Sequence, residues 1–271
     1  MIQVLPSLPE ALLATHGIVC VVGAGGKKST LYRLIDQASG RVGFTATTMS
    51  TTPDQKRFDA CILAEPGRLA LDVPRAASHQ HRIAYACPSV KSGRIAGLPP
   101  GLVARLHEHG DFNLTLVKAD GARMRGIKAP RADEPCLVPG CSVVIFVVSA
   151  HVLGQPLTEA IAHRVPILAE RLGMTVGERI TPMHIGRLLS HPQGAWQGVE
   201  QCPLVTLINQ VDSPGQRALA MTVAKTALTG EKPPSRVVLG SMIAEQPLID
   251  ILERPPGKTG AAEGQPLCPH Q

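Results

Sequence analysis

The chain has 271 residues, of which 44% are hydrophobic but only 3% aromatic, so it is long enough for one large domain with an aliphatic core. Its formal net charge of +6 favours anionic partners, but no aromatic residues are interleaved with the scattered Lys and Arg, which argues against nucleic-acid binding. No apolar stretch approaches the roughly 20 residues that span a bilayer, and the seven cysteines lack a regular disulfide spacing. We therefore expect a cytoplasmic, reduced protein that does not contact a membrane.

Strand-like and helix-like segments alternate in the first half of the chain. Residues 18–22 form a short apolar run that stops at glycines, and from Lys28 to Gly40 apolar residues recur at helical spacing. A further helix is predicted at about 101–109, after two prolines. Other short apolar runs indicate strands, which we place at residues 42–48, 60–63, 83–86, 114–117 and 143–148.

The second half of the chain begins with a segment in which short helical patterns replace the alternation of strands and helices. Two short helices are predicted at 166–172 and 182–190, and we interpret residues 157–201 as a small helical lobe inserted in the sheet domain. The pattern then returns to strand, helix and strand, at residues 204–208, 216–228 and 236–239.

The alternation of strands and helices predicts an α/β fold with a mainly parallel sheet flanked by helices. We expect this domain to occupy residues 1–253. Residues 254–271 are rich in Pro and Gly and lack the apolar residues that a core requires, so their composition predicts a disordered tail.

The most informative stretch lies where the first predicted strand meets the first predicted helix. Glycines there let several backbone N–H groups point at one anion, and the start of the helix adds partial positive charge. A lysine in this position reaches the terminal phosphates, and a hydroxyl ligates Mg²⁺. The stretch therefore predicts a P-loop that binds a nucleoside triphosphate, GTP or ATP, with Mg²⁺. The residues of this predicted cradle are Gly23, Ala24, Gly25, Gly26, Lys27, Lys28, Ser29 and Thr30.

The register of this P-loop is open, because the match to G-x-x-x-x-G-K-[ST] is imperfect. If Lys27 is the phosphate lysine, Lys28 stands at the hydroxyl position; if Lys28 is that lysine, Lys27 replaces the preceding glycine. We favour Lys27, with Ser29 or Thr30 near the metal. The rival interpretations are a glycine-rich turn without a ligand and a G-x-G-x-x-G dinucleotide fingerprint, which the glycines fit poorly.

Hydroxyl and acidic residues follow two more of the predicted strands. Thr47 and Thr48 end the second strand, where they could bind phosphate, Mg²⁺ or water, although threonines also favour strands for structural reasons. Asp120 follows a later apolar strand, and in P-loop proteins such an acid holds Mg²⁺. Its alternative role is to cap a turn. The metal ligands that we predict are Ser29, Thr30 and Asp120.

Two further places supply candidate nucleotide contacts. The sequence Asn-Gln-Val-Asp at 209–212 resembles the N-K-x-D motif with which GTPases read the base. A carboxylate at Asp212, beside Asn209, can accept hydrogen bonds from guanine that adenine cannot donate; the alternative is an ordinary polar loop. Arg164, at the edge of the helical lobe, either reaches the phosphates or lies on the surface.

Several blocks of the sequence, taken in order, resemble the YqeC family, whose members are described as accessory proteins of selenium-dependent hydroxylases. The most specific block is Ala-Asp-Gly-Ala-Arg at 119–123, followed by Ile-Lys-Ala-Pro at 127–130. The resemblance implies a P-loop fold and a role in maturing selenium-dependent molybdenum hydroxylases. It also implies that such a hydroxylase, or its cofactor-maturation proteins, are partners. The blocks cover most of residues 18–239 and lie at 21–31, 45–48, 119–130, 134–139, 153–164 and 207–212.

Two positions depart from the pattern of this family. Its members commonly carry an acid before the Ala-Asp-Gly sequence, where this chain has Lys118. They commonly carry a hydroxyl residue after the P-loop lysine, where this chain has Lys28. Both changes add positive charge beside the predicted phosphate site, which is consistent with tighter nucleotide binding, replacement of a metal contact or altered turnover.

Three functions compete on these observations. The first is an accessory enzyme that hydrolyses a nucleoside triphosphate while a cofactor is matured, with no residue that identifies itself as the base. The second is a binding protein that carries or inserts a cofactor and uses the nucleotide as a conformational switch. The third is an ATP-dependent ligase or kinase that acts on a small acid.

Overall fold

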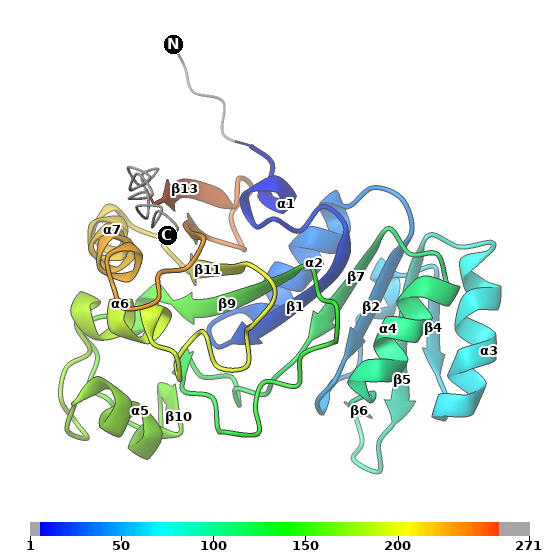
Figure 1. The fold of residues 1–271 in the computed structure, drawn as a ribbon, viewed down its shortest axis with the longest axis horizontal. Helices are drawn as coiled ribbons and strands as arrows, with labels where there is room; N and C mark the ends of the chain where they lie inside the picture. The colour runs from blue at the N-terminus through cyan, green and yellow to red at the C-terminus, as the bar shows by residue number, and fades with distance from the viewer. Residues whose placement is uncertain (1–5, 255–271) are drawn as a thin grey trace, which may run out of the picture.

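Eight parallel strands form the body of the sheet in residues 6–254, the part of the chain that the computed structural model describes (Figure 1). They lie in the order β12-β11-β9-β1-β7-β2-β5-β4, and each neighbouring pair is parallel. The predicted α/β fold with a mainly parallel sheet is thus confirmed. The strands are β1 (Gly17–Gly23), β2 (Val42–Ala46), β4 (Ala60–Leu63), β5 (Arg82–Pro88), β7 (Leu114–Lys118), β9 (Val143–Ser149), β11 (Leu204–Asn209) and β12 (Arg236–Gly240).

Antiparallel strands extend the sheet at both ends. At one end β13 (Leu248–Glu253) pairs with β12. At the other end β6 (Arg94–Ala96) pairs with both β5 and β3 (Ser50–Thr51). A separate short ladder joins β8 (Ile127–Lys128) to β10 (Ala162–His163), so the chain that follows β7 lies beside the chain that follows β9.

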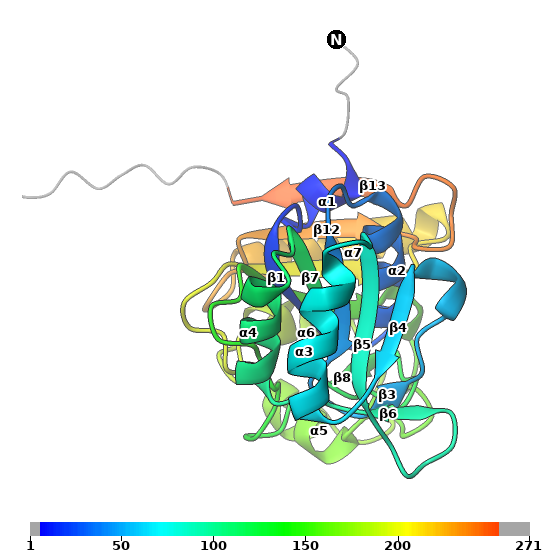
Figure 2. The same cartoon turned by 90° about the vertical axis from the view of Figure 1, so that its right-hand side faces the viewer.

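Helices cover both faces of the sheet, which explains why its central strands, such as β1, β9 and β11, are buried along almost their whole length. In β1, Val19 and Val21 pack with α1 and α2, whereas Ile18 and Val22 belong to the core on the opposite face. Figure 2 shows two helices of that opposite face, α3 and α4, side by side near β4 and β5. The helices are α1 (Leu8–Ala11), α2 (Lys27–Gln37), α3 (Pro66–Ala77), α4 (Pro100–His109), α5 (Val165–Leu172), α6 (Pro182–Ser190) and α7 (Pro214–Leu228), with 3₁₀ turns at Gln55–Arg57 and Ala150–Val152.

The chain changes direction across the sheet at β1. Helix α2 leads from β1 to β2 on one side, whereas β9, β11 and β12 lie on the other side. In open α/β sheets, ligands bind at the carboxyl ends of the strands at such a switch point. Gly23, Asp120 and Asn209 stand at, or just after, the carboxyl ends of β1, β7 and β11. The fold therefore gathers residues from distant parts of the sequence at one edge.

The segment predicted as a helical lobe contains β10, α5 and α6. Its buried side chains, among them Leu168, Ile185 and Leu188, belong to the same apolar cluster as Val144 of β9 and Val223 of α7. Helix α6 packs directly on α7. The segment thus shares the core of the sheet domain instead of building a core of its own.

No helix within residues 6–254 has the length and apolar character needed to cross a membrane. The tail predicted at 254–271 falls, apart from its first residue, outside the part of the chain that the structure describes.

Candidate functional site

The turn between β1 and α2 holds the three glycines of the predicted cradle. Gly23, Gly25 and Gly26 have φ values of 88°, 83° and 115°, in a region that other residues rarely adopt. The amides of Gly23 and Gly25 donate to Asp120 Oδ2 and to the carbonyl oxygen of Arg125, each at 2.9 Å. The turn is therefore tied to the loop that follows β7.

The start of α2 leaves backbone donors free. Within the described part of the chain, no acceptor pairs with the amide N–H groups of residues 26–29, and no side chain caps the helix. The amide of Thr30 is the first to bond back, to the carbonyl oxygen of Gly26 at 3.0 Å. Free amides at a helix N-terminus carry partial positive charge, so this turn has the geometry of an anion site.

Of the two lysines, Lys27 is the one whose side chain lies at the carboxyl ends of the central strands. Its Nζ lies 2.8 Å from Asp120 Oδ1 and also donates to the carbonyl oxygen of Gly23, and both charged side chains are buried. Burial lowers the pKa of Lys27, while Asp120 acts in the opposite direction. Lys28 points away from this pair, with its Nζ 3.0 Å from Thr51 Oγ1. This geometry supports Lys27 as the phosphate lysine.

Asp120 begins a chain of buried charges that runs away from the cradle. Its Oδ2 lies 2.8 Å from Lys128 Nζ, and the same Nζ lies 2.8 Å from Glu134 Oε2. Glu134 in turn accepts two hydrogen bonds from the guanidinium of Arg164. Three cations and two anions, counting Lys27, therefore share this site, and the cluster keeps one net positive charge.

The neighbouring cations lower the pKa of Glu134. Burial alone would raise the pKa of Glu134, but hydrogen bonds from Arg164 and Lys128 lower it to about 2. Arg164, which we considered as a phosphate contact, points at Glu134 and at the carbonyl oxygen of Ala129. Lys128 and Glu134 were not singled out from the sequence as site residues, because each looks like an ordinary surface charge until the β8–β10 ladder places Lys128 beside His163, next to Arg164.

The hydroxyl groups of the two threonines after β2 differ in their hydrogen bonding. Thr47 Oγ1 donates to the carbonyl oxygen of Cys136 at 2.7 Å. Thr48 Oγ1 is buried and has no hydrogen-bond partner within residues 6–254. Of the two predicted hydroxyls, Thr48 is therefore the one with capacity for a ligand.

Asn209 and Asp212 lie beside the cradle, but their side chains have different surroundings. Asn209 Nδ2 donates to the carbonyl oxygen of Gly25 at 2.8 Å, and its Oδ1 accepts the amide of Met242 at 3.0 Å. Asp212 is partly exposed and bonds His151 Nε2 and the Ser241 hydroxyl, at 2.8 and 2.7 Å. Asn209 thus holds the cradle in place, while the Asp212 carboxylate retains lone pairs for a base.

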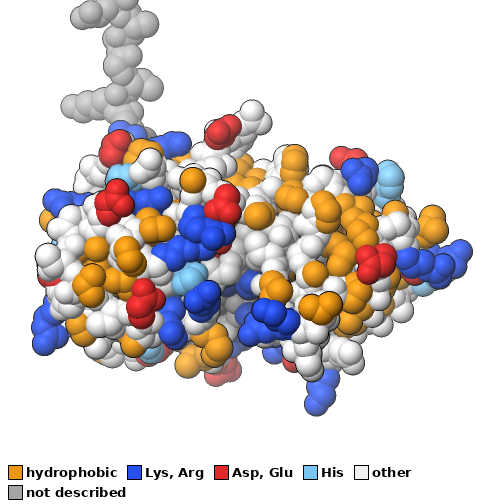
Figure 3. All heavy atoms as spheres, turned by 90° about the horizontal axis from the view of Figure 1, so that it is seen from below, with side chains coloured by type: hydrophobic (Ala, Val, Ile, Leu, Met, Phe, Trp, Pro, Cys, Tyr) orange, Lys and Arg blue, Asp and Glu red, His pale blue; other side chains and the backbone are white. Residues whose placement is uncertain are grey.

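Positive charge gathers around this edge of the sheet. Figure 3 shows Lys and Arg side chains around a hollow on the face seen from below. One contributor is Lys118, the last residue of β7, which aligns with Val21 of β1 and Ala46 of β2. Burial and the neighbouring Lys27 lower the pKa of Lys118 to about 8. An anionic ligand would relieve this crowding of cations.

The three predicted metal ligands, Ser29, Thr30 and Asp120, have different surroundings. Ser29 is exposed, and Thr30 Oγ1 donates to the carbonyl oxygen of Gly26 at 3.1 Å. Asp120 Oδ2 accepts the amide of Gly23 and lies beside Lys128, whereas its Oδ1 lies 2.8 Å from Lys27 but has no hydrogen-bond partner within the described chain. No group of three or more His, Cys, Asp or Glu residues in the described chain is placed to hold a metal ion. Direct coordination of Mg²⁺ by Asp120 would therefore compete with two buried lysines, whereas phosphate oxygens and water supply most ligands of a nucleotide-bound Mg²⁺.

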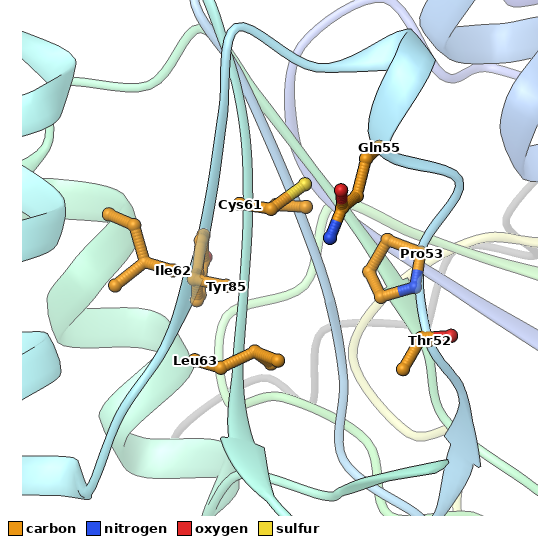
Figure 4. A pocket seen from close by; sticks show the side chains of 8 residues that line it. Thr52, Pro53, Gln55, Cys61, Ile62, Leu63 and Tyr85 are labelled. Carbon is orange, nitrogen blue, oxygen red and sulfur yellow. The ribbon is translucent and has the colours of Figure 1, made fainter. Parts of the chain in front are cut away.

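A shallow pocket opens near the cradle on the side of Lys28. Figure 4 shows Cys61 and Leu63 of β4 opposite Pro53 and Gln55, with Thr52 below them. Lys28 Nζ lies 3.3 Å from the carbonyl oxygen of Thr52, so the pocket adjoins the outer end of the cradle. Its lining is mostly apolar and contains none of the residues predicted to bind the nucleotide.

We expect replacement of Gly23 by alanine to destabilise the fold strongly. A Cβ at this position would collide with the backbone of Val147 in β9, in addition to the cost of a positive φ. Gly140 is a matched control, because its φ is 72° but a Cβ there would meet nothing within 4 Å. Urea denaturation should show a loss of about 1–2 kcal/mol for Gly140→Ala and at least about twice that loss for Gly23→Ala. Equal losses would contradict the close approach of the cradle to β9.

Comparisons with known proteins agree with the resemblance seen in the sequence. A family model described as YqeC protein matches residues 19–166. The uncharacterized protein YqeC of Escherichia coli (strain K12) is 32% identical over 213 residues, which are 74% of this chain and 81% of that protein. No solved structure shows a significant match to the chain.

Proposed function

The chain belongs to the YqeC family, and on that premise we propose that it binds a nucleoside triphosphate in the turn between β1 and α2. In this proposal it serves as an accessory protein in the maturation of selenium-dependent molybdenum hydroxylases. Cleavage of the bound nucleotide would accompany that role. The hydroxylase, or a protein that matures its cofactor, would be the partner, as the family resemblance implies.

One observation carries the proposal: a buried lysine and free helix amides converge at the carboxyl end of the strand where the sheet changes direction. Lys27 lies between Asp120 and the carbonyl oxygen of Gly23, within reach of any phosphate held by residues 26–29. Preorganised donors of this kind stabilise the negative charge of transferred phosphoryl groups. Burial makes their charge more effective, because little water competes for it.

Lys27 would exchange protein partners for phosphate when the nucleotide binds. Its bond to the carbonyl oxygen of Gly23 is the contact most easily replaced, because a phosphate oxygen offers a charge in place of a neutral acceptor. Asp120 would keep the ammonium group oriented and protonated. The direct test is calorimetric titration with ATP and GTP, followed by measurement of phosphate release. Absence of binding by both nucleotides would refute the proposal.

The proposal includes a preference for guanine, which rests on Asp212. Asparagine at this position keeps an acceptor but adds a donor, so Asp212→Asn should weaken GTP binding by about tenfold or more and leave ATP nearly unchanged. The same variant should gain affinity for xanthosine triphosphate, whose base presents a carbonyl oxygen in place of the amine. His151→Ala removes a partner of Asp212 and serves as the control. A wild-type preference for ATP would refute the assignment and favour a ligase or kinase.

A second candidate is a nucleotide-switched binding protein with little turnover. Asp120 is the only carboxylate in the described chain that hydrogen-bonds the cradle, and two lysines already hold it, so it is poorly placed to take a proton from water. Single-turnover assays separate the two candidates. Phosphate release much slower than nucleotide exchange would favour the switch.

A further inference from the structure

Two lysines outside the Lys27–Asp120 pair flank the same short stretch of chain after β2. Lys28 Nζ lies 3.0 Å from Thr51 Oγ1 and 3.3 Å from the carbonyl oxygen of Thr52. Lys118 Nζ lies 3.5 Å from the carbonyl oxygen of Met49. Both ammonium groups are thus directed toward residues 49–52, at the outer end of the phosphate cradle. None of these contacts is an ion pair with a carboxylate.

The position of Lys28 is the one from which a P-loop normally supplies a hydroxyl to the metal. Because Lys27 is the residue that faces Asp120, Lys28 follows the phosphate lysine directly. Its stem lies over the ring of Tyr32, with Nζ 5.3 Å from the ring centroid. Tyr32 and the carbonyl oxygen of Thr52 are neutral partners, so the charge of Lys28 is available to an anion.

Lys118 brings a second charge to the same place from a different strand. It ends β7, the neighbour of β1, and lies two residues before Asp120. Its side chain is partly buried at a point where Lys27, Lys128 and Arg94 add positive potential and Asp120 offsets part of it. Because the cations outnumber the acid here, an anion bound beside Lys118 would be favoured.

The acidic residue at this end of the sheet, Asp120, already pairs with two lysines. Asp120 accepts the amide of Gly23 and contacts Lys27 and Lys128, each at 2.8–2.9 Å. A divalent cation at Asp120 would have to displace a buried lysine and would then lie close to the remaining cations. The like charges that surround the carboxylate oppose this exchange.

We propose that Lys28 and Lys118 together take the place of Mg²⁺, so that this protein binds the triphosphate of a free nucleotide without a divalent cation. The inference rests on the proposed nucleotide binding. Mg²⁺ carries two positive charges, and the two lysines, both in contact with residues 49–52, supply the same total. Lys27 and the amides of residues 26–29 hold the phosphates on the inner side, and Lys28 and Lys118 neutralise them on the outer side.

The test compares the binding of GTP and ATP in EDTA and in excess Mg²⁺, by calorimetry on the full chain. We expect the wild-type dissociation constants in the two conditions to agree within about threefold. Binding that is more than about tenfold tighter in Mg²⁺ than in EDTA would overturn the inference and leave the nucleotide proposal standing. Absence of binding in both conditions would overturn both.

Variants at the two lysines provide an independent readout. Lys28→Ser and Lys118→Glu should each weaken binding in EDTA by about tenfold, and the double variant should recover affinity when Mg²⁺ is added. Lys225→Ser, on the exposed side of α7, is the matched control and should behave as the wild type. Far-ultraviolet circular dichroism checks that each variant is folded. A double variant that binds equally well in EDTA would overturn the inference.

Discussion

Replacement of Lys27 by methionine is expected to reduce nucleotide affinity by at least about 100-fold. Methionine keeps the apolar stem that packs inside the protein but removes the only ammonium group among the described residues that contacts both Asp120 and the cradle. The loss should be large because Lys27 is 5% exposed, so water cannot take over its role. Calorimetric titration with GTP and ATP measures the effect directly.

The control for this variant separates the site from general charge effects. Lys225→Met removes the same charge from the exposed side of α7 and should leave nucleotide affinity unchanged. Asp120 keeps Lys128 and the amide of Gly23 in the Lys27 variant, so the fold should survive. A folded Lys27→Met protein that still binds nucleotide as the wild type does would remove the cradle from the proposed function.

Glu134→Gln is expected to produce the largest loss of stability among single polar substitutions at this edge. Lys128 is fully buried and Arg164 is partly buried, and glutamine would leave both without their shared carboxylate. Removal of one partner from a buried ion pair typically costs about 3–5 kcal/mol, because a buried charge is left uncompensated. Lys128 retains Asp120, so we expect about 3 kcal/mol in the free energy of unfolding, measured by urea denaturation.

An exposed pair gives the matched comparison for Glu134. Glu253 pairs with Arg236 at the edge of the sheet, and Glu253→Gln should cost at most about 1 kcal/mol because water screens the pair. Similar losses for the two variants would show that burial does not strengthen the Glu134 cluster.

The Glu134 contribution should also depend on pH in a defined direction. Since folding lowers the pKa of Glu134 from 4.5 to about 2, its stabilising effect is full above pH 4.5 and is lost as the pH falls toward 2. The gap in unfolding free energy between the wild type and Glu134→Gln should therefore be constant from pH 7 to 5 and shrink below pH 4.5. A gap that widens on acidification would contradict this assignment.

Local patterns were enough to predict the parallel sheet and the cradle, because both depend on residues that are close in sequence. The helix at Pro66–Ala77 was not predicted, since Pro74 inside it reads as a break, although Leu69, Val73 and Ala77 have helical spacing. Strand β13 was also not predicted. All but the last of its residues are only partly buried, so it lacks the apolar run that marked the central strands.

The side-chain partners in the site could not be predicted, because they depend on contacts across the fold. Asn209 was expected at the base but holds Gly25, and Arg164 was expected at the surface or the phosphates but holds Glu134. The sequence shows that such residues are polar and follow strands. It does not show which acceptor each will meet, since that is decided by the strand order and by the β8–β10 ladder.

The side chain of Asn209 joins the turn between β1 and α2 to the loop that follows β12. Its Nδ2 donates to the carbonyl oxygen of Gly25, and its Oδ1 accepts the amide of Met242, just after β12. Arg33 of α2 also donates to the carbonyl oxygen of Met242, at 2.9 Å. The turn and the helix that follows it are therefore both hydrogen-bonded to Met242. A ligand that displaces the turn must therefore either break the hydrogen bonds to Gly25 and Met242 or shift Met242 together with the turn. We therefore expect a ligand that displaces the turn to disturb the loop between β12 and β13 as well.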